Sequence, residues 1–233
     1  MRIVETYSHM FGLDVLQNRY PELWAEVQQV IHAVDAEACR TKVSAERGRR
    51  AGQMLYSPRD MNAAFDREFN GRGWHERRVS YAVTADQGVL SNPGFFSLEY
   101  QEQVACIQQS GSEHFRSYNQ TDFVKDAVAV EVQFGKYSFV AYDLFVKHLA
   151  FFQQRSIEVG IEVLPMRELQ QQMSSGPAYY EGEIFNLARQ GRNSPPVPLI
   201  VLGVAPDLDD DLDSGELDDE VADVADAFEP AHD

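Results

Sequence analysis

The chain is poor in cysteine. Cys39 and Cys106 are its two cysteines, and they form no CxxC motif and no Cys/His spacing. The sequence therefore predicts neither a disulfide framework nor a zinc site, and it is typical of a reducing compartment. It also lacks an apolar run long enough to cross a membrane, and its first residues lack the apolar segment of a signal peptide. We expect a cytoplasmic protein with no membrane partner.

Basic residues are also few, because 20 Lys and Arg stand against 37 Asp and Glu, for a net charge of −17. Residues 207–233 hold 13 of the acidic residues and no Lys or Arg, so residues 1–206 carry 24 acidic and 20 basic side chains. This composition favours a disordered acidic tail over 207–233, although Leu217, Val221, Val224 and Phe228 have the approximate spacing of a transient helix. The remainder is long enough for one domain with a substantial core.

Within residues 1–206, much of the positive charge lies between residues 40 and 78. Binding to phosphate needs local positive charge rather than a positive total. Residues 40–52 form either a solvated loop or an arm that contacts phosphates, and the sequence favours neither. The basic side chains of this part of the chain are Arg40, Lys42, Arg47, Arg49, Arg50, Arg59, Arg67, Arg72, Arg77 and Arg78.

Strand and helix patterns alternate over residues 118–205. From Ala127 the chain alternates small or polar residues with Val128, Val130 and Val132, which predicts a buried strand. Apolar residues at helical spacing follow over Ala141–Arg155, and Leu199–Val204 is a continuous apolar run. This order predicts an α/β fold with a mixed β-sheet flanked by helices.

Two acidic residues lie on the predicted strand pair. A tight turn at Lys125-Asp126 would place Asp122 opposite Ala129, with the backbones of Asp122 and Glu131 diagonal neighbours roughly 7–8 Å apart. Buried carboxylates need compensation. A hard cation such as Mg²⁺ provides it, and so does a salt bridge to Lys125, Lys136 or an arginine. The spacing Asp-x8-Glu-x-Gln is by itself a weak signal.

Longer runs carry a resemblance to a known family. The run NQTDFVKDAVAVEVQFGKYSFVAYDLFVKHLAFF resembles type II restriction endonucleases of the BglII/BstYI family, as do MRIVETYSH, DAEACRTK, LYSP, VLPMREL, MSSGPAYYEGE and PLIVLGVAP. The likeness covers about residues 1–206, most closely 117–205, and is strongest to the BstYI type, which recognises RGATCY. It implies a PD-(D/E)xK restriction-endonuclease-like fold in a single endonuclease domain. It also implies a homodimer that cleaves double-stranded palindromic DNA with Mg²⁺.

The same resemblance implies site residues. Asp122, Glu131 and the backbone carbonyl of Val132 would hold the metal ion. Gln133 stands where related nucleases usually carry lysine, so it would orient the water, and the group that activates the water stays open.

The resemblance also implies residues that contact DNA. Lys136 and Ser175, with Ser174 and Gly176 in the same loop, would do so, and Lys136 and Ser175 would donate to the purine N7 of the outer base pair. The alternative is an ordinary turn lysine and loop serine, and their position in the family favours the contact with DNA. Two other functions remain open at this point: a DNA-repair nuclease of related fold, and a non-catalytic protein that mimics DNA or binds a partner through its acidic tail.

Overall fold

A six-stranded mixed β-sheet forms the centre of the protein in a computed structural model that describes residues 1–45, 51–135, 138–174 and 176–207. Its strand order is β1-β8-β7-β6-β5-β4, in which β6, β7 and β8 are parallel and the other neighbours are antiparallel. The strands are β1 (Arg2–His9), β4 (His75–Val83), β5 (Phe115–Lys125), β6 (Val128–Val132), β7 (Val159–Pro165) and β8 (Leu199–Ala205).

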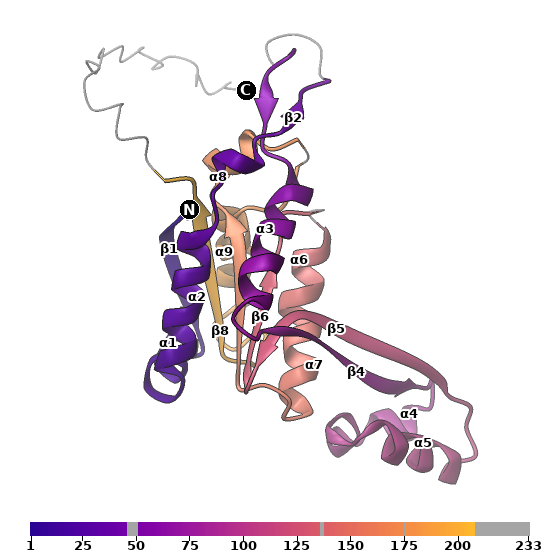
Figure 1. Cartoon of the computed structure of the whole chain (residues 1–233). Coiled ribbons are helices and arrows are strands. Elements are labelled where there is room, and N and C mark those ends of the chain that lie inside the picture. The colour runs from indigo at the N-terminus through magenta and orange to yellow at the C-terminus, as the bar shows by residue number, and fades with distance from the viewer. Residues whose placement is uncertain (46–50, 136–137, 175, 208–233) are drawn as a thin grey trace, which may run out of the picture.

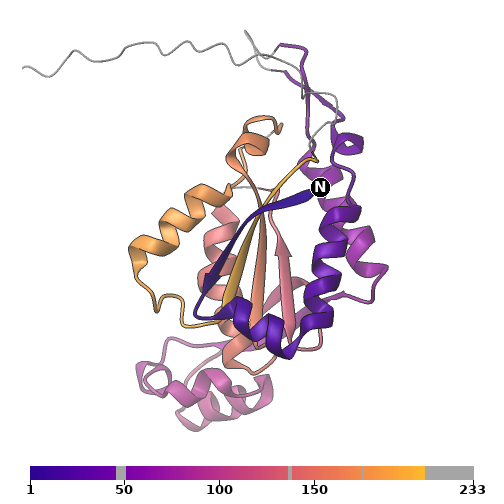
Figure 2. The ribbon, with the colours of Figure 1, turned by 90° about the vertical axis from the view of Figure 1, so that its left-hand side faces the viewer.

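Helices cover both faces of this sheet (Figures 1 and 2). One face packs against α2 (Pro21–Ala33) and α3 (Pro58–Asn70), and α1 (Gly12–Arg19) lies beside them. The other face packs against α9 (Tyr180–Gln190) and one long helix. That long helix consists of α6 (Ser138–Tyr142), the π-helical turn η3 (Asp143–Lys147) and α7 (His148–Gln153). The smaller elements are η1 (Glu37–Cys39), the hairpin of β2 (Lys42–Val43) and β3 (Met54–Leu55), and α8 (Arg167–Gln171).

Alternation along the central strands sets which side chains face which layer. Val128, Val130 and Val132 of β6 belong to the core under α2 and α3. Successive strand residues point to opposite faces, so Glu131 of β6 and Glu162 of β7, which are paired in register, lie toward the long helix. The sheet therefore carries one apolar face and one face into which two carboxyl groups are built.

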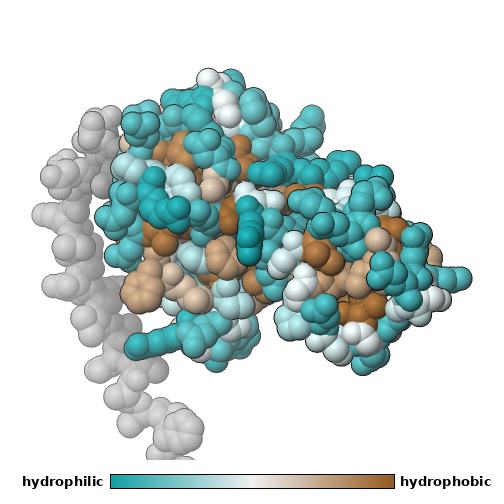
Figure 3. Space-filling view, turned by 90° about the horizontal axis from the view of Figure 1, so that it is seen from below, coloured by the Kyte–Doolittle hydropathy of each residue, from teal (hydrophilic) through white to brown (hydrophobic). Residues whose placement is uncertain are grey.

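Strands β4 and β5 continue beyond the sheet as a two-stranded arm (Figure 1). The arm ends in α4 (Gln87–Leu90), η2 (Pro93–Ser97) and α5 (Tyr100–Gln109), which share a small core of their own. Seen from below, this tip is a separate lobe on which apolar side chains lie exposed among hydrophilic ones (Figure 3). Phe115, for example, is 70% exposed.

The mixed α/β fold predicted from the sequence is confirmed, with corrections. The predicted register of the central hairpin is wrong by two residues: Lys125 pairs with Val128 and Phe123 with Val130, so the turn lies at Asp126-Ala127. Asp126 adopts a left-handed conformation there (φ 51°), which aspartate tolerates better than most residues. Continued beyond the last pair, this register places Asp122 level with Glu131 rather than with Ala129.

Other differences concern the lengths of the predicted elements and the residues that the structure describes. Strand β5 is 11 residues long, whereas the sequence predicted its segment Thr121–Val124. Residues 40–52 contribute to the β2–β3 hairpin, while 46–50 lie outside the described residues. Within the described part of the chain, no helix is both long enough and apolar enough to span a membrane. The predicted acidic tail lies outside the described residues except for Asp207, whose carboxylate accepts a hydrogen bond from the N-terminal amine at 3.0 Å.

Candidate active site

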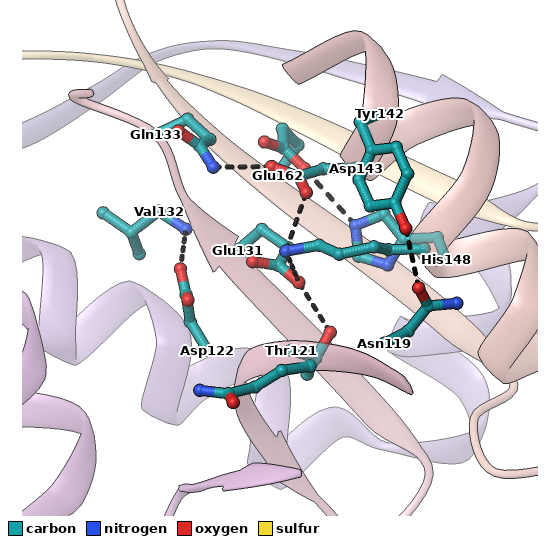
Figure 4. A network of polar contacts seen from close by, with 12 residues as sticks. Asn119, Thr121, Asp122, Glu131, Val132, Gln133, Tyr142, Asp143, His148 and Glu162 are labelled. Carbon is teal, nitrogen blue, oxygen red and sulfur yellow. Dashed lines mark hydrogen bonds and ion pairs between the residues drawn. The ribbon is translucent and has the colours of Figure 1, made fainter. Parts of the chain in front are cut away.

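The candidate site lies where strands β5 and β6 separate. Their ladder ends at the pair Phe123–Val130, and beyond it side chains of β5 reach across to β6. Oδ2 of Asp122 accepts a hydrogen bond from the backbone amide of Val132 at 3.3 Å, and Oγ1 of Thr121 donates to Oε1 of Glu131 at 2.6 Å (Figure 4). This separation of β5 and β6 is called the fork below. It holds the carboxylates of Asp122 and Glu131 at the end of β6.

Glu131 is fully buried. Burial and the neighbouring charge of Asp122 raise the pKa of its carboxyl well above the ordinary value, while the ammonium of Lys147 acts in the opposite direction. Nζ of Lys147 lies 2.8 Å from Oε1 of Glu131, the same oxygen that Thr121 contacts. The second oxygen, Oε2, has no hydrogen-bond partner in the described structure. An unpartnered buried oxygen is an open acceptor position for a cation.

Gln133 joins the site through Asp143. Its Nε2 donates to Oδ2 of Asp143 at 2.5 Å, and Oδ1 of Asp143 lies 2.7 Å from Nζ of Lys147. Burial raises the pKa of Asp143, and Lys147 and Gln133 oppose that effect. The charges of Glu131 and Asp143 outweigh burial at Lys147 and raise its pKa, so the ammonium stays protonated.

A second buried pair lies behind this network. Oε2 of Glu162 is 3.3 Å from Nε2 of His148, and both side chains are fully buried. Burial raises the pKa of Glu162 well above its ordinary value and lowers that of His148 to about 3, so the imidazole is uncharged at neutral pH. The imidazole fits against β7 because residue 160 is glycine, where any side chain would overlap the His148 ring.

Two clefts open beside the carboxylates. One, of about 500 Å³, is lined by Gln133, Asp143 and Lys147 together with Tyr118, Asn119, Gln120 and Tyr142. The other, of about 350 Å³, is lined by Asp122 and Val132 with Asn62, Asp66, Asn70, Glu76, Gln120 and Phe123. Tyr118, in the lining of the first cleft, carries the guanidinium of Arg78 at 4.2 Å from its ring centroid. The two clefts thus give access to the carboxylates of Asp122 and Asp143.

The donors present fit a hard divalent cation. No three His, Cys, Asp or Glu side chains within the described ranges are grouped as a protein-only metal site. Two carboxylates and the Val132 carbonyl are all oxygen donors, and Mg²⁺ characteristically takes one or two carboxylates and completes its shell with water and phosphate. The unpartnered Oε2 of Glu131 is the observation that supports this fit.

The structure brings together some of the residues predicted from the sequence. Lys147 and Asp143 join Glu131 to Gln133, and beside this network Asp122 contacts Val132 (Figure 4). The metal, catalytic and DNA-binding roles stay predictions.

The residues predicted to contact DNA lie elsewhere or are not described. Lys136 and Ser175 lie outside the described residues. Ser174 is hydrogen-bonded through its backbone amide to Tyr56, and neither it nor Gly176 lines the two clefts as far as the chain is described.

An ion pair at Glu131 is present, as the alternative predicted, but it is not made by Lys125, and Lys136 lies outside the described residues. Lys125 pairs with Glu26 at 2.7 Å, whereas the cation beside Glu131 is Lys147. Sequence reasoning missed Lys147 and Asp143. The signal that could have found them is their i, i+4 spacing on the helix that follows the strand.

Comparisons with known proteins agree with this architecture. A structural search finds a crystal structure of restriction endonuclease BglII complexed with a DNA 16-mer, at 19% identity and a TM-score of 0.57, covering 89% of this chain and 79% of that chain. It also finds free BglII, at 20% identity and a TM-score of 0.53, covering 89% and 81%. These likenesses show the fold, and a comparison with curated proteins finds no match. The family model described as "Restriction endonuclease BglII/BglIII" matches residues 4–204, so the chain belongs to this family of site-specific deoxyribonucleases.

Proposed function

We propose that this restriction endonuclease uses Mg²⁺ to cut double-stranded DNA at RGATCY after the purine, leaving 5′-GATC overhangs, and that it acts as a homodimer. The observation that carries the chemistry is the fork, where Asp122 and Glu131 meet and Glu131 keeps one oxygen free. The site sequence rests on the resemblance to the BstYI type.

The metal ion, when bound, would lower the pKa of the attacking water and neutralise charge that grows on the phosphate. Asp122, Glu131 and the Val132 carbonyl would hold it. The Asp122 side chain is already anchored on the Val132 amide, so its second oxygen can turn toward the ion without reorganisation of the strand.

Gln133 would orient the water. Its amide nitrogen is engaged by Asp143, which fixes the side chain and leaves Oε1 to accept a hydrogen bond from the water. An amide does not take up a proton at neutral pH, so Gln133 positions the nucleophile and does not serve as its base.

The homodimer follows from the number of sites per chain. The fork is the one Asp-x8-Glu-x-Gln site that the sequence supplies, so one chain cuts one strand. A palindrome presents the same bases to two subunits related by a two-fold axis, and a symmetric pair therefore cuts both strands. A cytoplasmic location agrees with a DNA substrate and with the two free cysteines.

Base reading would come from Lys136 and Ser175, with Ser174 and Gly176 in the same loop. A donor to purine N7 accepts adenine and guanine alike, because both bases present N7 in the major groove. That property gives the degenerate outer position R.

Mapping the cut ends tests the proposal. Purified protein with Mg²⁺ is incubated with duplexes containing AGATCT, GGATCC, AGATCC or CGATCG, and both ends are sequenced. We expect cleavage of the first three with GATC overhangs, no cleavage of the fourth, no cleavage with EDTA, and a dimer by light scattering. Blunt ends, cutting at CGATCG, or metal-independent cleavage would contradict it, and cutting of branched rather than palindromic DNA would instead support a repair nuclease.

A further inference from the structure

Lys147 is a buried cation with two carboxylate partners at the candidate site. Its ammonium lies 2.8 Å from Oε1 of Glu131 and 2.7 Å from Oδ1 of Asp143, and its side chain is 12% exposed. It reaches this position from η3, the π-helical turn inside the long helix. Such turns are rare within α-helices and recur at functional sites, because they redirect side chains that regular winding would place elsewhere.

The hydrogen-bond pattern at Glu131 is asymmetric. Oε1 receives both Lys147 and Thr121, from a helix on one side and from β5 on the other, while Oε2 receives no donor in the described structure. Two donors from separate elements fix the plane of a carboxylate that would otherwise rotate. The free oxygen is therefore held in one direction (Figure 4).

Asp143 is the second carboxylate that holds the Lys147 ammonium. It binds Lys147 with one oxygen and Gln133 with the other, so the ammonium connects the Gln133 amide to the Glu131 carboxylate. Three carboxyl groups, those of Asp122, Glu131 and Asp143, stand around one ammonium, so acidic groups outnumber basic ones where the cation would bind.

We propose that Lys147 is a positioning residue of the metal site, which aims Oε2 of Glu131 at the divalent cation and links that ligand to Gln133 through Asp143. This inference rests on the proposed metal-dependent cleavage. Lys147 lies on the long helix, whereas the proposed ligands Glu131 and Val132 lie on strand β6.

The sign of the change in metal affinity tests this role. If Lys147 acted only as a positive charge near the ion, its removal would tighten binding of a cation, because like charges repel. If Lys147 aims the ligand, its removal weakens binding, because Glu131 loses one of the two donors that hold it and a ligand must be preorganised to bind well.

The experiment titrates the full-length protein with Mn²⁺ in the absence of DNA and follows free Mn²⁺ by electron paramagnetic resonance. We expect Lys147→Met to weaken Mn²⁺ binding at least fivefold and Lys147→Arg, which restores a cation with donors, to recover at least half of that loss on a logarithmic scale. Lys125→Met is the matched control, because Lys125 makes an ion pair of 2.7 Å with Glu26, which is not a residue of the candidate site. This variant should leave Mn²⁺ affinity unchanged.

Several outcomes overturn the inference. Equal or tighter binding in Lys147→Met would do so, as would an equal loss in Lys125→Met, which would indicate a general structural effect. If Lys147→Met does not fold, Thr121→Val replaces it, because that variant removes the other donor to Oε1 of Glu131 without a change of charge, and it should weaken Mn²⁺ binding in the same direction. Failure of the wild-type protein to bind Mn²⁺ at all would reject the proposed function, whereas normal wild-type binding with no effect of either variant would reject this inference alone.

Discussion

The carboxylate of Asp122 is hydrogen-bonded to the backbone amide of Val132 at the point where the β5–β6 ladder has ended. A side chain thus replaces the missing ladder partner of that amide. The Val132 amide therefore lacks a backbone partner on β5 and bonds to the Asp122 carboxylate, which it holds beside Glu131.

Removing either carboxylate charge should stop cleavage. We expect Asp122→Asn and Glu131→Gln each to lower the rate of DNA cleavage by more than about a hundredfold, because even residues that only orient metal ligands contribute 10–100-fold. Specific binding with Ca²⁺ should persist in a gel-shift assay. Asp14→Asn, at an exposed position on α1, is the control. Cleavage within a few-fold of wild type in both variants would remove these residues from the metal site.

Gly160 should be essential for packing of His148. A methyl group at this position would overlap the imidazole of His148, so Gly160→Ala should lower the free energy of unfolding by about 1–3 kcal/mol. Urea denaturation measures the change. Gly176→Ala is the control, because its added methyl group would lie 3.9 Å from Gln170, an ordinary contact. An unchanged midpoint for Gly160→Ala would show that the helix can move away from β7.

His148 should make stability fall in acid. Burial lowers its pKa to about 3, whereas in the unfolded chain it titrates near its ordinary pKa of 6.5. Between these values the unfolded state binds the extra proton, so stability decreases as the pH falls through this window, by at most about 1.4 kcal/mol per pH unit. His148→Gln should therefore lose less stability than wild type between pH 6.5 and 4. Identical slopes for His148→Gln and wild type would contradict the assignment.

The acidic C-terminal residues should weaken non-specific DNA binding. Deleting residues 208–233 removes 12 acidic side chains and keeps Asp207 with its bond to the N-terminal amine. We expect the shortened protein to bind non-cognate duplex more tightly at low salt, with the difference fading near 0.1 M salt, where the Debye length is about 10 Å. Its melting temperature and cut site should not change. A shortened protein that fails to fold would show that these residues belong to the core.

Lys136 and Ser175 should set the outer base pair. Replacing both with asparagine should shift preference toward adenine, because asparagine can read adenine N6 together with N7. The measurement is the ratio of cleavage rates on AGATCT and GGATCC. The single variants serve as controls for each position, and an unchanged ratio in the double variant would exclude both residues from base reading.

The periodic parts of this fold could be predicted from sequence, and the long-range parts could not. Alternating valines identified β6, and helical spacing identified the long helix. Strand β1 was not recognised, because its burial is mixed and its place in the sheet depends on pairing with β8, almost two hundred residues away. The hairpin register was wrong because Lys-Asp and Asp-Ala are both weak turn pairs, and the backbone conformation of Asp126 decided between them.

The residues of the candidate site that lie close together in the sequence were likewise predicted, and those that lie further along the chain were not. Asp122, Glu131 and Gln133 share a short segment, so local pattern and family resemblance identified them together. Lys147 and Asp143 escaped because their i, i+4 spacing shows only that they can pair with each other on one helix. It does not show that a π-helical turn brings this pair to Glu131.

One strand serves two distant parts of the molecule. Strand β5 begins at Phe115 near the arm tip and passes through Asp122 before it ends at Lys125, so the arm and the site share a single stiff backbone element about 35 Å long. A rigid strand transmits bending and twist along its length. A displacement of the arm tip along β5 would therefore be expected to change the Asp122–Val132 contact, and amide hydrogen exchange at Val132 measures such a change.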